Sequence, residues 1–208
     1  MFKALALQIS RLFGPFTVMT LVMLYLLLTN TGLTSQQQLT IAPILGVTFL
    51  VFPLGLLVYY KWRGRVSDLD LTRREERNQW LNWIVVSGWL GTIASFAFEP
   101  PQLYRSLLIL SMVVLTTATL ITFYKKISLH MTGATTTYLI INIIFDWRYW
   151  WLAVLLPMIA WARWYLKKHT PVQLLLGTAL PVVIFLIIYI VVWKLRSHDL
   201  PDQLRRGF

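Results

Sequence analysis

Apolar residues follow one another along this chain in seven long segments, which are separated by short polar stretches. The segments cover roughly residues 12–30, 40–60, 80–98, 104–124, 127–146, 149–166 and 172–194. Most of them approach the ~20 residues with which a helix crosses the ~30 Å hydrocarbon core of a bilayer, and they lack the strict alternation of a barrel strand. The pattern predicts an all-α integral membrane protein. We expect a bundle of six to seven transmembrane helices, because segment 149–166 is short and aromatic.

The stretches between the segments contain residues that commonly begin or end helices. They include Asn30 with Gly32, Pro100 with Pro101, Asp146, and Thr170 with Pro171. Tryptophans gather near the same ends, as in the aromatic belts of membrane proteins: Trp80, Trp83, Trp147, Trp150, Trp151, Trp161 and Trp164. The pattern contains no internal repeat. We therefore expect one transmembrane helical domain over residues 1–208, with a polar C-terminal tail at 195–208.

The composition agrees with a membrane location and narrows the choice of partners. Hydrophobic residues make up 57% of the chain and charged residues 13%, which is about half the charged share of a typical soluble domain. The formal net charge is +11. Most basic residues flank apolar segments, so we expect membrane lipids with anionic headgroups as partners and no nucleic acid. The chain has no cysteine, which excludes disulfides and thiolate metal sites.

Three loops, at 61–79, 125–130 and 163–171, fall on the same side of a seven-helix topology. They carry 11 lysines and arginines, and the opposite side carries 8. Those eight are Lys3, Arg11, Arg105, Arg148, Lys194, Arg196, Arg205 and Arg206. The positive-inside rule places the three basic loops in the cytoplasm.

The same loops hold side chains suited to phosphate chemistry. His130 and His169 each lie close to cations in the sequence, and Arg163 precedes His169 by six positions. A guanidinium binds phosphate oxygens through paired donors, while one neutral histidine can act as a nucleophile and a second can donate a proton. Simpler interpretations stand beside this one. The loops can be topology signals, His130 can be a core residue, and a Thr170–Gln173 helix cap explains Gln173 without chemistry.

The spacing of Arg163 and His169 in "ARWYLKKH" resembles the third motif, SR-x5-H-x3-D, of the type 2 phosphatidic acid phosphatase superfamily. "ISLH" at 127–130 is similar to a degenerate form of the second motif, PSGH, and the first motif, K-x6-RP, aligns with residues 70–78. The resemblance covers roughly residues 60–185. It is to a divergent bacterial branch, which implies the bacterial inner membrane as the location.

The resemblance implies a role for each residue that matches a motif. His169 would be the phosphoryl-accepting nucleophile, and His130 would be the general acid. The phosphate would be bound by Arg163, Arg77 and Ser128. The implied activity is hydrolysis of a lipid or isoprenoid phosphate or diphosphate. It requires no metal ion and no cofactor, because the arginines supply the charge compensation.

The chain also departs from these motifs. Asp70, Ile127, Leu129, Ala162 and Gln173 stand where the family has Lys, Pro, Gly, Ser and Asp. These departures favour an alternative, a non-catalytic subunit of a membrane-protein complex that kept the fold and binds lipid, pigment or partner helices. His130 or His169 would then be available as an axial ligand of a pigment metal.

A third interpretation is a prenyl transferase that holds a magnesium diphosphate with Asp68 and Asp70. Such enzymes commonly need a second aspartate-rich motif, and the sequence offers none. The three interpretations remain open on the sequence alone.

Overall fold

The computed structural model describes residues 2–14, 22, 24–25, 33–67 and 73–198, and its regular structure is helical throughout that part of the chain. Much of the first predicted segment, 12–30, lies outside the described residues. The described helices are α1 (Phe2–Leu12), α3 (Ser35–Gly46), the π-helical η1 (Val47–Val51), α4 (Phe52–Trp62), α5 (Arg74–Phe96), α6 (Gln102–Tyr124), α7 (Leu129–Ile144), the 3₁₀ turn η2 (Trp150–Val154), α8 (Leu155–Tyr165) and α9 (Pro171–His198). The predicted all-α class is confirmed for these residues. Helix α9 continues into the first residues of the predicted polar tail.

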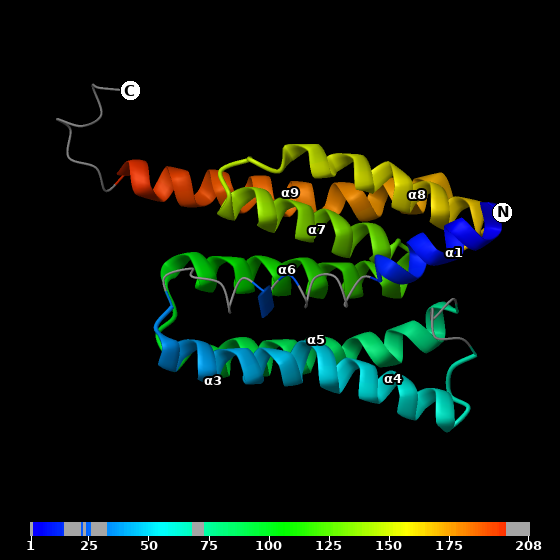
Figure 1. The fold of residues 1–208 in the computed structure, drawn as a ribbon, viewed down its shortest axis with the longest axis horizontal. Coiled ribbons are helices and arrows are strands. Elements are labelled where there is room, and N and C mark those ends of the chain that lie inside the picture. Colours follow the sequence, from blue (N-terminus) through cyan, green and yellow to red (C-terminus); the bar gives the residue numbers. More distant parts are fainter. Residues whose placement is uncertain (1, 15–21, 23, 26–32, 68–72, 199–208) are drawn as a thin grey trace.

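The long helices lie side by side along the long axis of the molecule (Figure 1). Helices α3, η1 and α4 follow one another in a single rod that packs against α5, and α5 packs against α6. Helices α7, α8 and α9 form a second group, and α6 lies between the two groups and contacts both. The arrangement brings the beginnings of α5, α7 and α9 to the same end of the bundle.

Three helical stretches are long and apolar enough to cross a membrane, judged by length and composition. They are Ser35–Trp62 with 28 residues, Gln102–Tyr124 with 23 and Pro171–Ile190 with 20. A helix of ~20 residues is about 30 Å long, which matches the hydrocarbon core. Helix α7 has 16 residues and α8 has 11, and α5 carries two glutamates in its first turn. The structure thus supports a membrane protein with three candidate spans, and the count of six to seven remains a prediction.

The predicted turn signals near Pro101 and Thr170 mark real helix starts. Pro101 is the N-cap of α6. The Oγ1 of Thr170 accepts from the N–H of Gln173 at 3.4 Å, and the Oε1 of Gln173 accepts from the N–H of Thr170 at 3.3 Å. This reciprocal pair satisfies two backbone donors that the first turn of α9 would otherwise leave open. The predicted cap at Thr170 is therefore confirmed.

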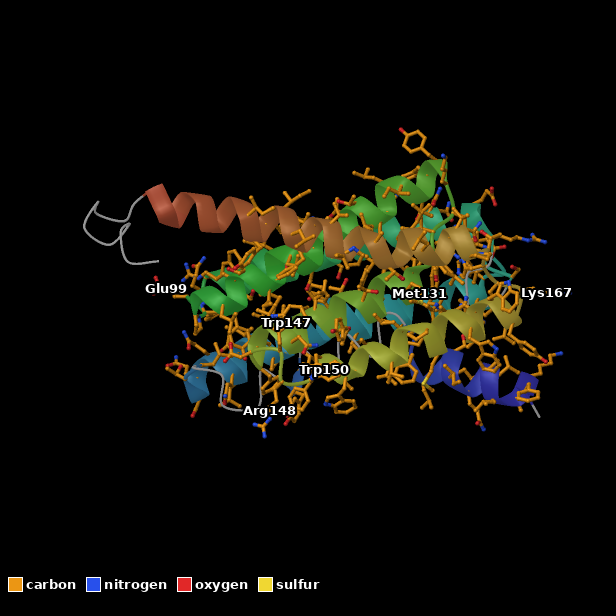
Figure 2. All side chains as sticks on the ribbon, turned by 90° about the horizontal axis from the view of Figure 1, so that it is seen from above. Glu99, Met131, Trp147, Arg148, Trp150 and Lys167 are labelled. Atoms are coloured by element: carbon orange, nitrogen blue, oxygen red, sulfur yellow. The ribbon has the colours of Figure 1, made fainter. Side chains whose placement is uncertain are left out.

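The three basic loops meet at one end of the bundle, as expected (Figure 1). Arg77, in the first turn of α5, donates from Nη1 to the carbonyl oxygen of Ile127 at 3.0 Å. The N–H of Ser128 donates to the carbonyl oxygen of Gln173 at 3.1 Å. These bonds join the α4–α5, α6–α7 and α8–α9 connections into one polar layer. Figure 2 shows Lys167 at this end and Glu99 toward the other.

Lys3 and Arg11 were assigned to the opposite side, and this assignment is wrong. Helix α1 packs against α8 at the loop end, where Ala6 and Ile9 enter a core cluster that also contains Ile159. The prediction failed because it treated residues before segment 12–30 as a tail on the far side of a first span. With α1 in its observed place, both cations add to the positive charge of the loop end.

Helices α7 and α9 approach each other closely at Gly177. A Cβ atom at this position would lie 2.6 Å from the carbonyl oxygen of Ser128 and 3.1 Å from the Cβ of Met131. Real Cβ atoms do not approach a backbone atom so closely, so a side chain here forces the helices apart. Gly177 therefore keeps the turn at Ser128 seated on α9.

Replacing Gly177 by alanine should lower the free energy of unfolding by about 1–3 kcal/mol, because the backbone of α7 must shift. Gly55→Ala is the matched control, since nothing lies within 4 Å of a Cβ at that position in α4. It should raise stability by about 0.5–1 kcal/mol through a less flexible unfolded chain. Thermal unfolding of both variants in detergent tests this. Equal shifts in the two proteins would contradict the close approach.

Cysteine labelling should find the loop end on one side of the membrane. The chain has no native cysteine, so single cysteines in place of Lys3, Arg65 and Lys125 can be labelled in oriented vesicles with an impermeant maleimide. All three side chains are exposed and should react from the same side. A cysteine in place of the exposed Arg148 should react from the opposite side. Mixed sidedness among the first three would overturn the topology.

Candidate functional site

The loop end contains four ionisable side chains that are almost completely buried. The exposed fraction is 3% for Arg77, 7% for His130, 1% for Arg163 and 5% for His169. They come from the starts of α5 and α7, from the end of α8 and from the turn before α9. Burying a cation costs several kcal/mol unless hydrogen bonds and nearby groups compensate. Sequence reasoning predicted that these residues would share one site, and the structure brings them into one layer.

Ser10 of α1 joins two of the predicted site residues. Its Oγ accepts a hydrogen bond from Nη1 of Arg163 at 2.6 Å, and its carbonyl oxygen lies 3.2 Å from Nε2 of His130. Ser10 is itself 6% exposed. Because a carbonyl can only accept, the hydrogen atom of His130 is on Nε2 in this state. Sequence reasoning missed Ser10, although a serine between apolar positions of a short amphipathic helix was a usable signal.

Gln173 sets the protonation pattern of His169. The Oε1 of Gln173 lies 3.1 Å from Nδ1 of His169 and also accepts the N–H of Thr170. The backbone donor fixes the orientation of the amide, so its oxygen faces the imidazole. Nδ1 of the neutral ring therefore carries the hydrogen, and Nε2 keeps its lone pair. Gln173 thus contacts His169 in addition to capping α9, a role that the capping interpretation did not include.

Burial lowers the pKa of His169 to about 3. The positive charges of Arg163 and Arg77 act in the same direction, while the hydrogen bond to Gln173 opposes the shift. An ordinary histidine titrates near 6.5. His169 is therefore neutral at pH 7, and its Nε2 is a potential nucleophile without prior deprotonation.

Two further predicted site residues hold the loop between α6 and α7 in place. Ser128 is fully buried, and its Oγ accepts from the N–H of Met131 at 3.4 Å as the N-cap of α7. Arg77 donates to the carbonyl of Ile127 in the same loop. In this state both residues support the site, and their contact with phosphate remains a prediction.

A cationic hollow opens beside the buried cluster. Its volume is about 370 Å³, and it is lined by Lys126, Trp164, Lys167, Lys168, His169, Thr170, Pro171 and Gln173. Three lysines and one histidine line a space that is large enough for an anionic headgroup. The sequence placed Lys167 and Lys168 close to His169, but it favoured a topology signal for both lysines and named neither as a phosphate-binding residue.

The shape of this hollow depends on how α8 ends. Lys167 has a positive φ of 54°, and the N–H of Lys168 donates to the carbonyl of Arg163 at 3.1 Å. The N–H of Lys167 donates to the carbonyl of Trp164 at 2.9 Å. This is a Schellman ending, in which glycine is the usual residue at the left-handed position. A lysine there costs roughly 1 kcal/mol in backbone strain, and it brings a cation to the rim of the hollow.

Metal ligands do not cluster in the part of the chain that the structure describes. Asp68 and Asp70, the residues proposed to hold a magnesium diphosphate, lie outside it. The prenyl transferase interpretation therefore remains untested.

Comparisons of the chain with protein-family models, with curated proteins and with solved structures found no match.

The low pKa of His169 should make stability depend on pH. Between pH 3 and 6.5 the unfolded chain binds a proton on this histidine that the folded protein does not, so acid favours unfolding. The free energy of unfolding should be highest above about pH 6.5 and fall as the pH is lowered toward 3. His169→Asn should make this slope less steep in thermal unfolding scans. Part of the slope should remain, because burial also lowers the pKa of His130 to about 3. Scans at pH 8, where both histidines are neutral in both states, show the effect of the substitution on packing alone. An unchanged slope would show that His169 does not contribute.

Proposed function

We propose that this chain is a membrane-embedded phosphatase of lipid or isoprenoid phosphates or diphosphates, built on six to seven transmembrane helices. The observation that carries the proposal is the state of His169. Its Nδ1 is bonded to Gln173, its pKa is low, and its side chain lines a hollow beside three lysines. A neutral imidazole with an available Nε2 next to cations is what a phosphoryl-accepting nucleophile needs.

The position of the hollow suits a substrate that is anchored in the bilayer. It lies beside the first turn of α9 and the end of α6, two of the three candidate spans. A hydrocarbon tail would lie along these helices while its phosphate reaches Lys126 and Lys168. Trp164, which is 57% exposed at the rim, suits the membrane interface. The proposed location is the bacterial inner membrane, with the loop end on the cytoplasmic side.

The proposed reaction has two steps. In the first step, Nε2 of His169 attacks phosphorus, an N–P bond forms, and the P–O ester bond breaks. The leaving alkoxide takes a proton from His130. Burial and Arg163 lower the pKa of this histidine to about 3 in the present state, so His130 first takes up that proton from water when the anionic phosphate binds beside it. In the second step, water attacks phosphorus and gives a proton back to His130, and the N–P bond breaks to release phosphate. Arg163 and Arg77 stabilise the charge on the phosphate oxygens, so these steps need no metal ion.

The contacts of Ser10 favour a second candidate function. Nε2 of His130 and Nη1 of Arg163 both face Ser10, so neither atom faces the hollow in this state. In a non-catalytic subunit these contacts would be permanent, and their role would be to hold α1 against α7 and α8. Its partners would be lipids, a pigment or helices of other membrane proteins.

Phosphate release separates the two functions. Wild-type protein in detergent and in liposomes should release phosphate from short-chain isoprenoid diphosphates or lysophospholipid phosphates, and His169→Ala should abolish the release. Gln173→Glu keeps the reach of the helix cap and adds a carboxylate that stabilises a charged imidazole. Because acid–base arrangements contribute ~10²–10⁴-fold, a rate increase of about tenfold is expected.

Gln173→Leu is the matched control, because it removes the acceptor and should lower the rate. Wild-type release that does not exceed the His169→Ala background, across several lipid phosphates, would reject the phosphatase. Co-purification from native membranes would then test the subunit.

A further inference from the structure

Ser10 presents two oxygen atoms to two of the groups that the proposed reaction uses. The hydroxyl oxygen accepts from Arg163 at 2.6 Å, and the carbonyl oxygen accepts from His130 at 3.2 Å. One donor belongs to the end of α8 and the other to the first turn of α7. Residues from three helices thus converge on one small, buried volume.

A phosphate monoester offers the same chemistry as this pair of oxygens. It is an acceptor at several oxygens a short distance apart, and it carries negative charge that Ser10 lacks. Hydrogen bonds from a guanidinium to an anion are shorter and roughly twice as strong as those to neutral acceptors. An oxyanion that reaches Arg163 and His130 therefore binds more strongly than Ser10 does.

When Ser10 is displaced, helix α1 can bind to the surface of the membrane. It is held in the bundle by Ala6, Ile9 and Ser10, which are buried. Its exposed residues include Phe2 and Leu12, which are 59% and 70% exposed, together with Lys3 and Arg11. Apolar and cationic side chains on a short amphipathic helix suit the surface of an anionic bilayer. The loop end is where such a surface would meet the protein.

We propose that Ser10 plugs an oxyanion subsite between Arg163 and His130, and that the phosphate headgroup of a membrane lipid displaces it while α1 moves onto the bilayer surface. The structure is then the closed state. The use of the opened subsite in catalysis rests on the proposed function, whereas the displacement itself requires only anion binding.

The first test measures binding of inorganic phosphate to the purified full chain by calorimetry. Ser10→Ala removes one of the competing oxygens, so phosphate affinity should rise at least three- to tenfold, roughly the effect of one hydrogen bond to a neutral acceptor. Ser111→Ala is the matched control. It also deletes a buried hydroxyl, one that donates to the carbonyl of Leu107 at 2.8 Å on α6, and it should leave the affinity unchanged.

The second test follows α1 directly, through a cysteine in place of Ile9, which is 7% exposed in the closed state. Its reaction with N-ethylmaleimide should accelerate about fivefold or more in vesicles that contain a phosphate-monoester lipid, because local opening exposes the buried face of α1. Vesicles without that lipid, with or without inorganic phosphate, distinguish a headgroup from free phosphate. Ile84→Cys, at a position that is 1% exposed on α5, is the matched control and should stay protected.

Three results would overturn the proposal: equal or weaker phosphate binding by Ser10→Ala, phosphate binding by neither protein, or Ile9→Cys labelling that no phosphate changes. Labelling that responds to inorganic phosphate but not to the lipid would overturn the lipid as the occupant. Failure of the proposed function looks different, because binding and labelling would then respond while no phosphate is released from any lipid.

Discussion

A guanidinium that is removed from water must find acceptors inside the protein, and much of the loop end is arranged around this requirement. Arg163 is 1% exposed, and one of its partners is the hydroxyl of Ser10. Leaving such a cation unsatisfied would cost several kcal/mol, a large part of the stability of a typical domain. The end of α8 and the body of α1 are therefore held together by the hydrogen bond from Arg163 to Ser10 as well as by the apolar contacts of Ile9. The carbonyl of the same serine then brings in α7 through His130.

Much of the fold could be predicted because its signals are local. Apolar length marks α6 and α9, and a capping box marks the start of α9 at Thr170. The shared end of the three basic loops follows from counting helices between them. The relation of His169 to Gln173 is also local, because His169 directly precedes the capping box that Thr170 forms with Gln173. None of these features depends on contacts between residues far apart in the chain, so each could be predicted from a short stretch of sequence.

The parts that could not be predicted depend on distant contacts or on backbone conformation. Ser10 meets His130 and Arg163 across 120 and 153 positions of the chain, and no periodicity encodes that meeting. The apolar residues of α1 merge with segment 12–30 in the sequence, so a separate helix was not expected. Lys167 adopts a left-handed conformation that favours glycine. Because the sequence has no glycine at this position, it gave no signal for the Schellman ending that places Lys167 at the hollow.

The oxygen of Gln173 serves two structures that have separate reasons to exist, the first turn of α9 and the imidazole of His169. A substitution at position 173 therefore has to be compatible with both the helix cap and the orientation of His169. Chains descended from a common ancestor should retain an acceptor of similar reach there for as long as either histidine orientation or the cap is needed. Where the histidine has been lost, position 173 should drift among ordinary capping residues. Related chains in which residues 169, 170 and 173 are retained together would be those in which His169 is still functional.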